Sequence, residues 1–312
     1  MSAVTAAPYV PPSPASAGRR PVEVSFEFFP PNDTAMEETL WASLQRLAPL
    51  GPRFVSVTYG ADGSTRERTH NVVTRILRET ALTAAPHLTC VGAPRDEILD
   101  IARSYWDAGV RHIVALRGDV PTGQGRYAPH RDGFAYAVDL VRGLRSVGDF
   151  DVSVAAYPEV HPEAPDAQSD LDNLRAKVDA GATRAITQFF FDTDLFLRFR
   201  DRCEAVGLGA KIVPGILPIT RFPHMLKFAK RCGATVPDWL VQRFDGLDDD
   251  AETRRMIAAS FAIEQVRRLQ EHGVHEFHFY TLNRAELTYA ICHALGVRAP
   301  SPLAGSQAVV EA

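Results

Sequence analysis

The chain has 312 residues, of which 46% are hydrophobic and 23% are charged, and its formal net charge at pH 7 is -4. This composition is typical of a globular chain with a sizeable core, and the charge balance excludes the basic surface that nucleic acid and anionic membranes require. No run approaches the roughly 20 apolar residues that span a bilayer. We therefore expect small-molecule partners and neither nucleic acid nor membrane.

The cysteines indicate the compartment. They are widely spaced and form no C-x-x-C pair; they are Cys90, Cys203, Cys232 and Cys292. This spacing predicts neither a disulfide framework nor a zinc site, and no apolar signal region follows the paired arginines before the first strand-like run. We expect a cytoplasmic protein.

The two ends of the chain differ from its middle. Residues 1–20 are rich in Pro, Ala and Ser without periodicity, and residues 300–312 show the same character, so we predict disordered tails. Residues 21–299 contain eight short apolar, β-branched or aromatic runs, which we predict to be strands. They are 22–29, 54–59, 87–91, 112–116, 152–157, 185–191, 211–217 and 276–282.

Nearly all of these runs precede a stretch with apolar residues at helical spacing. The clearest are "MEETLWASLQRL", "RDEILDIARSYWDAG", "DLDNLRAKVDAGA", "TDLFLRFRDRCEAVG" and "AETRRMIAASFAIEQVRRLQEHG". Strand and helix alternating eight times, at roughly 30 residues a unit, predict a single-domain α/β protein of the (β/α)8 TIM barrel type. A doubly wound sheet is the alternative, but no G-x-G-x-x-G fingerprint follows the first strand. We interpret the acidic "DGLDDD" run before the last strand as a solvated helix start.

Polar residues gather where the predicted strands end, which is where a barrel places its chemistry. Glu27 is the single carboxylate in the apolar run "VSFEFF", and it shares a strand face with Ser25 and Phe29. The other strand ends offer Thr58, Tyr59, "GADGS", Arg117, Gly118, Asp119, Tyr157, "HPEA", Gln188, Thr281, Asn283 and Arg284. Any one of the charged residues could form a structural ion pair within the barrel, but the set as a whole predicts a functional site.

Eight motifs, one at each predicted strand, resemble those of the bacterial methylenetetrahydrofolate reductase family. They are "FEFFPP", "VTYGA" followed by "GSTRERT", "PHLTC", "IVALRGD", "AAYPEVHPEA", "ITQFFFD", "PGILPI" and "FHFYTLNRAE", and the likeness runs from about residue 22 to about residue 298. The resemblance implies a homo-oligomeric (β/α)8 flavoprotein with ping-pong kinetics. Such an enzyme takes a hydride from NADH or NADPH onto FAD, then passes it to 5,10-methylenetetrahydrofolate, which yields 5-methyltetrahydrofolate for methionine synthesis.

The same resemblance implies roles for individual residues. Glu27 would be the general acid that opens the folate ring, because burial beside aromatic side chains favours the neutral form of a carboxyl. Asp119 would lie beside the flavin and accept hydrogen bonds from the folate pterin. Gln188 would contact folate and nicotinamide in turn, Phe228 would pack on the substrate, and Arg284 would bind the glutamate tail.

A larger set of positions matches residues that bind FAD in the family. They are Thr58, Tyr59, Ala61, His87, Arg117, Gly118, Asp119, Ala137, Tyr157, His161, Ala164, Asp170, Asn173 and Lys177. In this set Arg117 and Lys177 would balance the pyrophosphate charge. One position departs from the family, because Ala176 stands where the relatives carry an arginine, which predicts one missing cofactor contact.

Other interpretations stay open from the residues themselves. Glu27 could be a structural carboxylate paired with Arg117 or Arg284. The barrel could be a metal-dependent hydrolase or aldolase with Glu27, Asp119 and histidines as ligands, or a flavin-binding protein without turnover. The spacing of His272, His275 and His278 straddles a helix end and a strand start, so we expect no common metal site.

Overall fold

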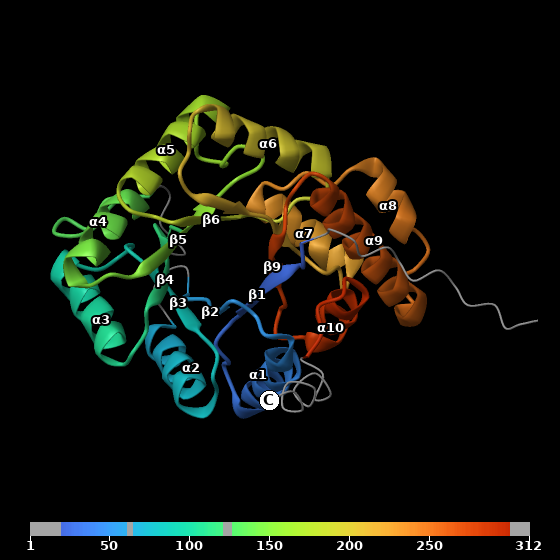
Figure 1. Cartoon of the computed structure of the whole chain (residues 1–312), viewed down its shortest axis with the longest axis horizontal. Helices are drawn as coiled ribbons and strands as arrows, with labels where there is room; N and C mark the ends of the chain where they lie inside the picture. The colour runs from blue at the N-terminus through green and yellow to red at the C-terminus, as the bar shows by residue number, and fades with distance from the viewer. Residues whose placement is uncertain (1–19, 61–64, 121–126, 300–312) are drawn as a thin grey trace, which may run out of the picture.

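The structure is a computed structural model, and it describes residues 20–60, 65–120 and 127–299. The predicted tails at 1–19 and 300–312 and the candidate Ala61 lie outside the described residues. Within them, parallel strands form a barrel and the helices lie outside it, so the predicted (β/α)8 architecture is confirmed (Figure 1).

The sheet runs in the order β7-β6-β5-β4-β3-β2-β1-β9-β8, and every pairing is parallel. The strands are β1 (Glu23–Phe28), β2 (Val55–Val57), β3 (Ala84–Thr89), β4 (His112–Leu116), β5 (Asp151–Ala156), β6 (Arg184–Thr187), β7 (Lys211–Val213), β8 (Gly215–Ile216) and β9 (Glu276–Tyr280). Most boundaries lie within a few residues of the predicted runs, and β3 and β6 show clear differences. β3 begins at Ala84, ahead of the predicted start at His87. The sequence pattern missed this start because the first residues of the strand are small and carry no β-branched signal. β6 ends at Thr187, and the aromatic residues after it form a buried loop.

The predicted strand 211–217 is interrupted at Pro214, which has no N–H to donate to a ladder. The half before it, β7, pairs with β6, and the half after it, β8, pairs with β9. The barrel therefore closes through this one segment, which turns from one neighbour to the other. The nine described strands thus correspond to eight barrel positions.

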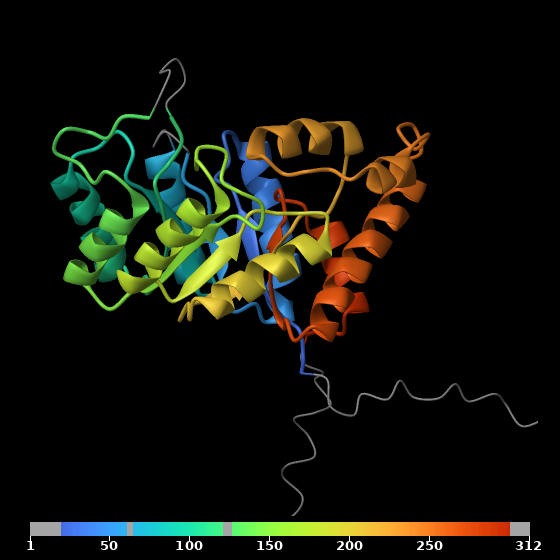
Figure 2. The same ribbon diagram turned by 90° about the horizontal axis from the view of Figure 1, so that it is seen from above.

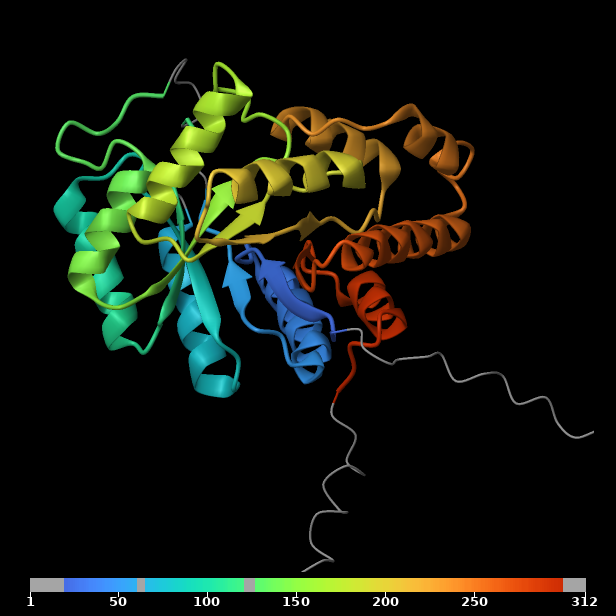
Figure 3. The same ribbon diagram turned by 45° about the horizontal axis from the view of Figure 1, so that its top comes forward.

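The helices enclose the barrel, and those nearest the two ends of the described chain meet. They are α1 (Thr34–Leu47), the 3-10 turn η1 (Ala48–Leu50), α2 (Arg66–Glu79), α3 (Arg95–Asp107), α4 (Ala137–Val147), α5 (Ala167–Asp179), α6 (Thr193–Ala205), α7 (Phe222–Cys232), α8 (Asp238–Phe244), α9 (Ala251–Glu271) and α10 (Ala285–Ala294). Figures 1 and 3 show α10 beside α1, and Figure 2 shows α9 and α10 together at one side of the ring. No helix in the described ranges is long and apolar enough to cross a bilayer.

Local sequence explains where several helices begin and end. The side chains of Asp33, Asp166, Asp192 and Asp250 accept hydrogen bonds from backbone N–H groups in the first turns of α1, α5, α6 and α9. The last of these closes the acidic "DGLDDD" run, so its interpretation as a helix start is confirmed. Gly109, which follows α3, has a φ of 91°, a conformation that glycine adopts without strain.

The strands bury both of their faces. Outward side chains of β1, such as Phe26 and Phe28, join the main apolar cluster beneath the helices. A second, small cluster of Phe54, Ala85, Val114 and Ile186, with Leu116 against it, is distinct from the main core. Because side chains alternate along a strand, these residues share the inner face with Glu27 and its neighbours, and the barrel is filled rather than hollow.

Candidate active site

The centre of the candidate site is Glu27, near the carboxyl end of β1. This strand lies between β2 and β9, and Glu27 is level with Ser56 on one side and Tyr280 on the other. The Glu27 side chain is 20% exposed, so it reaches solvent at the open end of the barrel. The carboxylate is therefore inside the barrel, but it is open to solvent at that end.

Two histidines face the same oxygen of Glu27. His87 Nε2 on β3 lies 3.5 Å from Glu27 Oε2, and His278 Nε2 on β9 lies 3.6 Å from it. Both ring nitrogens are buried and have no hydrogen-bond partner within the described residues. Burial lowers the pKa of His87, against the opposing effect of the Glu27 charge, so this ring favours its neutral form.

His278 is a site residue that the sequence reasoning missed, together with Ser25. Nδ1 of His278 and Oγ of Ser25 share a hydrogen bond of 2.8 Å, and the two residues are level with each other in the β1–β9 pair. The available signal was strand alternation in "EFHFY", which places His278 on the same face as Tyr280 and hence toward Glu27. The histidine spacing 272, 275 and 278 obscured it, because His272 lies exposed beyond α9 whereas His278 is fully buried.

Asn283 fixes the end of the strand that carries Glu27. Its side chain accepts from Phe29 N–H at 3.0 Å and donates to Phe29 C=O at 2.9 Å, while Thr281 Oγ1 donates to Glu27 C=O at 2.6 Å. Asn283 and its neighbour Leu282 both have positive φ, 55° and 52°, which non-glycine residues seldom adopt. This local strain indicates that surrounding contacts hold the turn after β9 in place against the end of β1.

The loop after β4 brings Asp119 and Arg117 to the same end of the barrel. Asp119 is exposed, and Gly118 beside it has a φ of 91°. Arg117 forms a two-pronged ion pair with Glu163, at 2.6 and 2.9 Å, which raises the pKa of the arginine. Glu27 is therefore not paired with Arg117, contrary to one of the structural alternatives, and the exposed Arg284 has no described ion pair with it.

The loop after β5 gathers the next group of candidates. Tyr157 and His161 pack edge to face with ring centroids 4.5 Å apart, and Asp170 accepts a hydrogen bond from the His161 N–H. Lys177 is buried and donates to Ala155 C=O at 2.7 Å, and burial lowers its pKa to about 8. Ala164 N–H donates to His161 C=O, Ala137 begins α4, and Asn173 is an exposed residue of α5.

The remaining candidates lie at other strand ends. Thr58 N–H donates to Phe28 C=O, which ties β2 to β1, and the Tyr59 hydroxyl accepts from Arg66 Nε at 2.7 Å. Gln188 follows β6 and is half-buried, with its side-chain oxygen bonded to the next N–H. Phe228 on α7 stacks on Phe189 with centroids 5.1 Å apart, so it is an apolar wall above the loop after β6.

The residues at this end of the barrel fit a flat aromatic cofactor. Gly118 offers backbone without a side chain, Tyr157 offers a ring, and Thr89 Oγ1 and His87 Nε2 are buried polar atoms without partners in the described chain. Lys177 and Arg117 already have partners within the chain. A lysine ammonium has three N–H donors and an arginine guanidinium has five, so each can bind a pyrophosphate oxygen in addition to these contacts.

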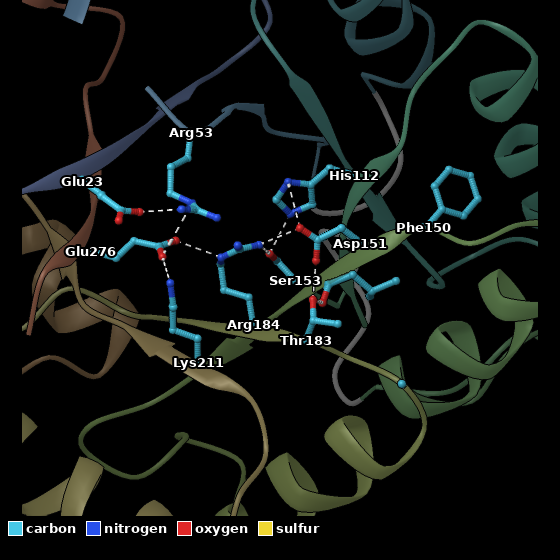
Figure 4. Close-up of polar contacts among 12 residues, drawn as sticks. Glu23, Arg53, His112, Phe150, Asp151, Ser153, Thr183, Arg184, Lys211 and Glu276 are labelled. Carbon is cyan, nitrogen blue, oxygen red and sulfur yellow. Dashed lines mark hydrogen bonds and ion pairs between the residues drawn. The ribbon is translucent and has the colours of Figure 1, made fainter. Parts of the chain in front are cut away.

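The opposite end of the barrel holds an ionic network, and Figure 4 shows it across several strands. Arg184 bonds Glu276 at 3.0 Å and Asp151 at 3.0 Å, and Lys211 bonds Glu276 at 2.6 Å. These residues begin their strands, so they lie at the amino ends. A cavity of about 460 Å³ is lined in part by these groups, but their charges are already paired, so we assign it no chemistry.

Phe54 lies between this network and the group formed by Glu27, His87 and His278. Its ring packs against His112, with centroids 4.3 Å apart, and lies under the Arg184 guanidinium, 5.4 Å from its central carbon. The same ring stacks on His278, with centroids 5.7 Å apart. Ionisable groups therefore occupy both ends of the barrel interior, with the Phe54 ring between them.

No group of three or more His, Cys, Asp or Glu side chains in the part of the chain that the structure describes is arranged to hold a metal ion.

Comparison with known proteins matches this arrangement to one family. A family model described as "Methylenetetrahydrofolate reductase" matches residues 15–296. The "5,10-methylenetetrahydrofolate reductase" of Pectobacterium carotovorum subsp. carotovorum is 59% identical over 277 residues, which cover 89% of this chain and 91% of the relative. The chain belongs to the methylenetetrahydrofolate reductase family. The resemblance of the eight motifs is thereby confirmed.

Further comparisons agree with membership of the methylenetetrahydrofolate reductase family. The "5,10-methylenetetrahydrofolate reductase" of Escherichia coli is 58% identical over 277 residues, which cover 89% of this chain and 92% of the relative. A solved structure, an uncharacterized protein from Clostridium thermocellum that binds two copies of 5-methyl-5,6,7,8-tetrahydrofolic acid, matches with a TM-score of 0.63 and 16% identity. It covers 89% of this chain and 95% of that chain, and at this identity the match shows the shared fold alone.

Proposed function

We propose that this chain reduces 5,10-methylenetetrahydrofolate to 5-methyltetrahydrofolate with a hydride from NADH or NADPH. The observation that carries the proposal is Glu27, a partly exposed carboxyl between two buried histidines at the open end of a barrel of this family. Bound FAD would accept the hydride from the nicotinamide and give it to the folate carbon.

Glu27 supplies the proton that this reaction consumes. The substrate's methylene bridges two nitrogens, and a proton placed on one of them breaks a carbon–nitrogen bond and leaves an iminium carbon that accepts hydride. The 20% exposure of Glu27 lets the carboxyl meet a substrate and regain its proton from solvent between turnovers.

Asp119 and Gln188 orient the folate. An exposed carboxylate such as Asp119 accepts two hydrogen bonds from the neighbouring N–H groups of a pterin edge, and a half-buried amide such as Gln188 both donates and accepts. Phe228 covers the substrate ring, and the exposed Arg284 pairs with the carboxylates of the glutamate tail. Nicotinamide and folate use this one face in turn, which gives ping-pong kinetics.

We assign the remaining matching positions to the cofactor. Thr58, Tyr59, His87, Gly118, Tyr157 and His161 would hold the flavin ring, and Arg117 and Lys177 would balance the charge of the pyrophosphate. Ala137, Ala164, Asp170 and Asn173 complete the set, with Ala61 outside the described residues. We also propose a cytoplasmic homo-oligomer; the four cysteines are free, as a reducing compartment requires, and exposed Trp239 and Met256 offer apolar surface to a second copy.

The colour of the purified protein tests the proposal. We expect a yellow protein that NADH or NADPH bleaches and that regains its colour when methylenetetrahydrofolate is added. A colourless protein with bound divalent metal would instead support a metal-dependent hydrolase or aldolase, and a yellow protein that no nicotinamide bleaches would support a flavin-binding protein without turnover. Parallel initial-rate lines with the two substrates are the expected kinetic pattern, and converging lines would contradict ping-pong exchange.

A further inference from the structure

His278 has one nitrogen engaged and one nitrogen free. Nδ1 shares a 2.8 Å hydrogen bond with Ser25 Oγ, whereas Nε2 is buried without a hydrogen-bond partner among the described residues and points at Glu27 Oε2 from 3.6 Å. A fully buried ring nitrogen without a partner is costly unless another group satisfies it during function. The Glu27 carboxyl is the group that it faces.

We assign the hydrogen of the His278 ring to Nδ1 from the contacts of Ser25. The Ser25 hydroxyl is directed at the Phe277 carbonyl, 3.4 Å away, to which it donates. Because a hydroxyl has a single hydrogen, Ser25 then accepts at its remaining lone pairs, and His278 Nδ1–H is the donor that meets them. The neutral ring in this tautomer presents a lone pair at Nε2.

We propose that His278 is a positioning residue for the proton of Glu27: anchored through Nδ1–H on Ser25, it presents its Nε2 lone pair to the carboxyl and holds Glu27 in the protonated form that the folate step uses. The proposal rests on the acid role proposed for Glu27. The 3.6 Å separation is long for a hydrogen bond, but catalytic hydrogen bonds of this length commonly shorten when substrate fills a site.

The surroundings of the pair favour a neutral arrangement. Glu27 faces His87 from β3 and both His278 and Tyr280 from β9, and β2 contributes only the uncharged Ser56 at its level. Burial lowers the pKa of His87 and holds the pKa of the Tyr280 hydroxyl well above its usual value, so neither group supplies a fixed charge at neutral pH. The Phe54 ring contacts both His112 and His278, and no contact of His112 with Glu27 is present among the described residues.

The kinetic test replaces His278 and follows the two half-reactions by stopped flow against pH. His278→Phe keeps a ring but removes the acceptor. The pH midpoint at which the rate of the folate half-reaction falls on the alkaline side should therefore be lower by about one unit, equivalent to about 1.4 kcal/mol. His278→Gln can return an amide oxygen to the position of Nε2 and should recover part of the shift. The pH dependence of flavin reduction by NADH should show no such shift in either variant.

His112→Gln is the matched control. His112 is also a buried histidine whose ring nitrogen bonds a serine, at 2.8 Å from Ser153 Oγ, but it does not face Glu27. We expect no movement of the pH midpoint in this variant. If His112→Gln and His278→Phe shift the midpoint equally, the effect is one of general packing and the proposal is wrong.

A spectroscopic measurement needs no turnover. In protein labelled with ¹⁵N-histidine, NMR distinguishes the two neutral tautomers and the cation, and the His278 signals are those lost in His278→Phe. We expect the Nδ1–H tautomer at neutral pH, and we expect Ser25→Ala to release the ring from it. A cationic His278, or a hydrogen on Nε2 in the wild-type protein, would overturn the proposal.

The result also separates this inference from the proposed function. If Glu27→Gln leaves the folate half-reaction at its full rate, the acid role of Glu27 fails, and the role of His278 fails with it. If Glu27→Gln slows that half-reaction but His278→Phe leaves its pH midpoint in place, the function stands and only the inference about His278 is wrong.

Discussion

Glu27 shows how one carboxylate acquires a role from its position. Its strand is apolar on the outer face, where Phe26 and Phe28 pack under helices, so the inner face alone can carry a polar group. The neighbours on that face are the histidines His87 and His278, and Ser25 is hydrogen-bonded to the latter. This is a setting for holding and giving a proton, whereas the ionic groups at the amino ends of the strands are paired with one another.

Glu27→Gln should slow the folate half-reaction and leave flavin reduction almost unchanged. Glutamine keeps the shape of the side chain but has no proton to give, and acid catalysis typically contributes about 10²- to 10⁴-fold. We expect the folate half-reaction to slow by at least that factor, or about 3 to 5 kcal/mol at the barrier, and flavin reduction to change little. Stopped-flow measurement of both steps decides the matter, because an equal loss in both would mean that Glu27 maintains the structure of the site and is not its acid.

Asp119→Asn should act differently from Glu27→Gln. Asp119 is exposed after β4, and removing its negative charge beside a bound flavin should make the reduced flavin easier to form. The same change removes an acceptor for the pterin, so folate turnover should fall. Measurement of the flavin potential in the two variants checks this: a potential that rises in Asp119→Asn and stays unchanged in Glu27→Gln is expected, and equal potentials would contradict it.

Among the elements, the interrupted strand β7–β8 does most to complete the barrel. Gly215 begins β8 and is level with His278 on β9, and its N–H donates to Thr187 Oγ1 at 3.0 Å. The Tyr280 hydroxyl donates to the C=O of the same residue, Thr187, at 2.8 Å. The backbones approach closely here because residue 215 has no side chain.

Gly215→Ala should therefore destabilise the barrel closure. An added Cβ would lie 2.2 Å from Thr187 C=O and 2.6 Å from a ring carbon of Tyr280, so the backbone of β6 or β8 has to move. We expect a loss of about 3 kcal/mol or more in the free energy of unfolding, measured by urea titration. Gly209→Ala is the control, since a Cβ there meets nothing within 4 Å; a similar loss in both variants would refute the explanation by close approach.

For the whole molecule, the buried histidines link folding to pH. Burial lowers the pKa of His112 to about 3, whereas an unfolded histidine titrates near about 6.5. Between these pH values the unfolded chain binds more protons than the folded chain. The contribution of His112 to the free energy of unfolding is therefore fully present above about pH 6.5 and is lost as the pH falls toward about 3. Burial lowers the pKa of His87 in the same direction.

We expect the free energy of unfolding to fall by about 1 kcal/mol per pH unit from His112 alone in this window. Urea titrations of the wild-type protein and His112→Gln between about pH 7 and about pH 5 measure it, and the variant should show the shallower dependence. Identical slopes for the two proteins would mean that His112 is not the group that takes up the proton.

The sequence by itself determined the alternation of strands and helices, the barrel class and the family. These rest on local signals, namely apolar periodicity, capping residues such as Asp250 and short motifs in order, which depend on neighbours along the chain. It also placed Glu27 on the same strand face as Ser25 and the candidate residues at predicted strand ends. Strand boundaries at β3 and β6 were predicted less well, because small residues in one and buried aromatic residues in the other give misleading local signals.

Only the tertiary structure decided which side chains meet. Ser25 and His278 are separated by 253 positions in the chain, and the closure of the barrel sets them level in adjacent strands, so no local pattern could pair them. The same holds for Arg117 with Glu163 and for Asn283 with the peptide of Phe29. Strand register assigns partners across the barrel, and register follows from packing of the whole ring rather than from the residues of one strand.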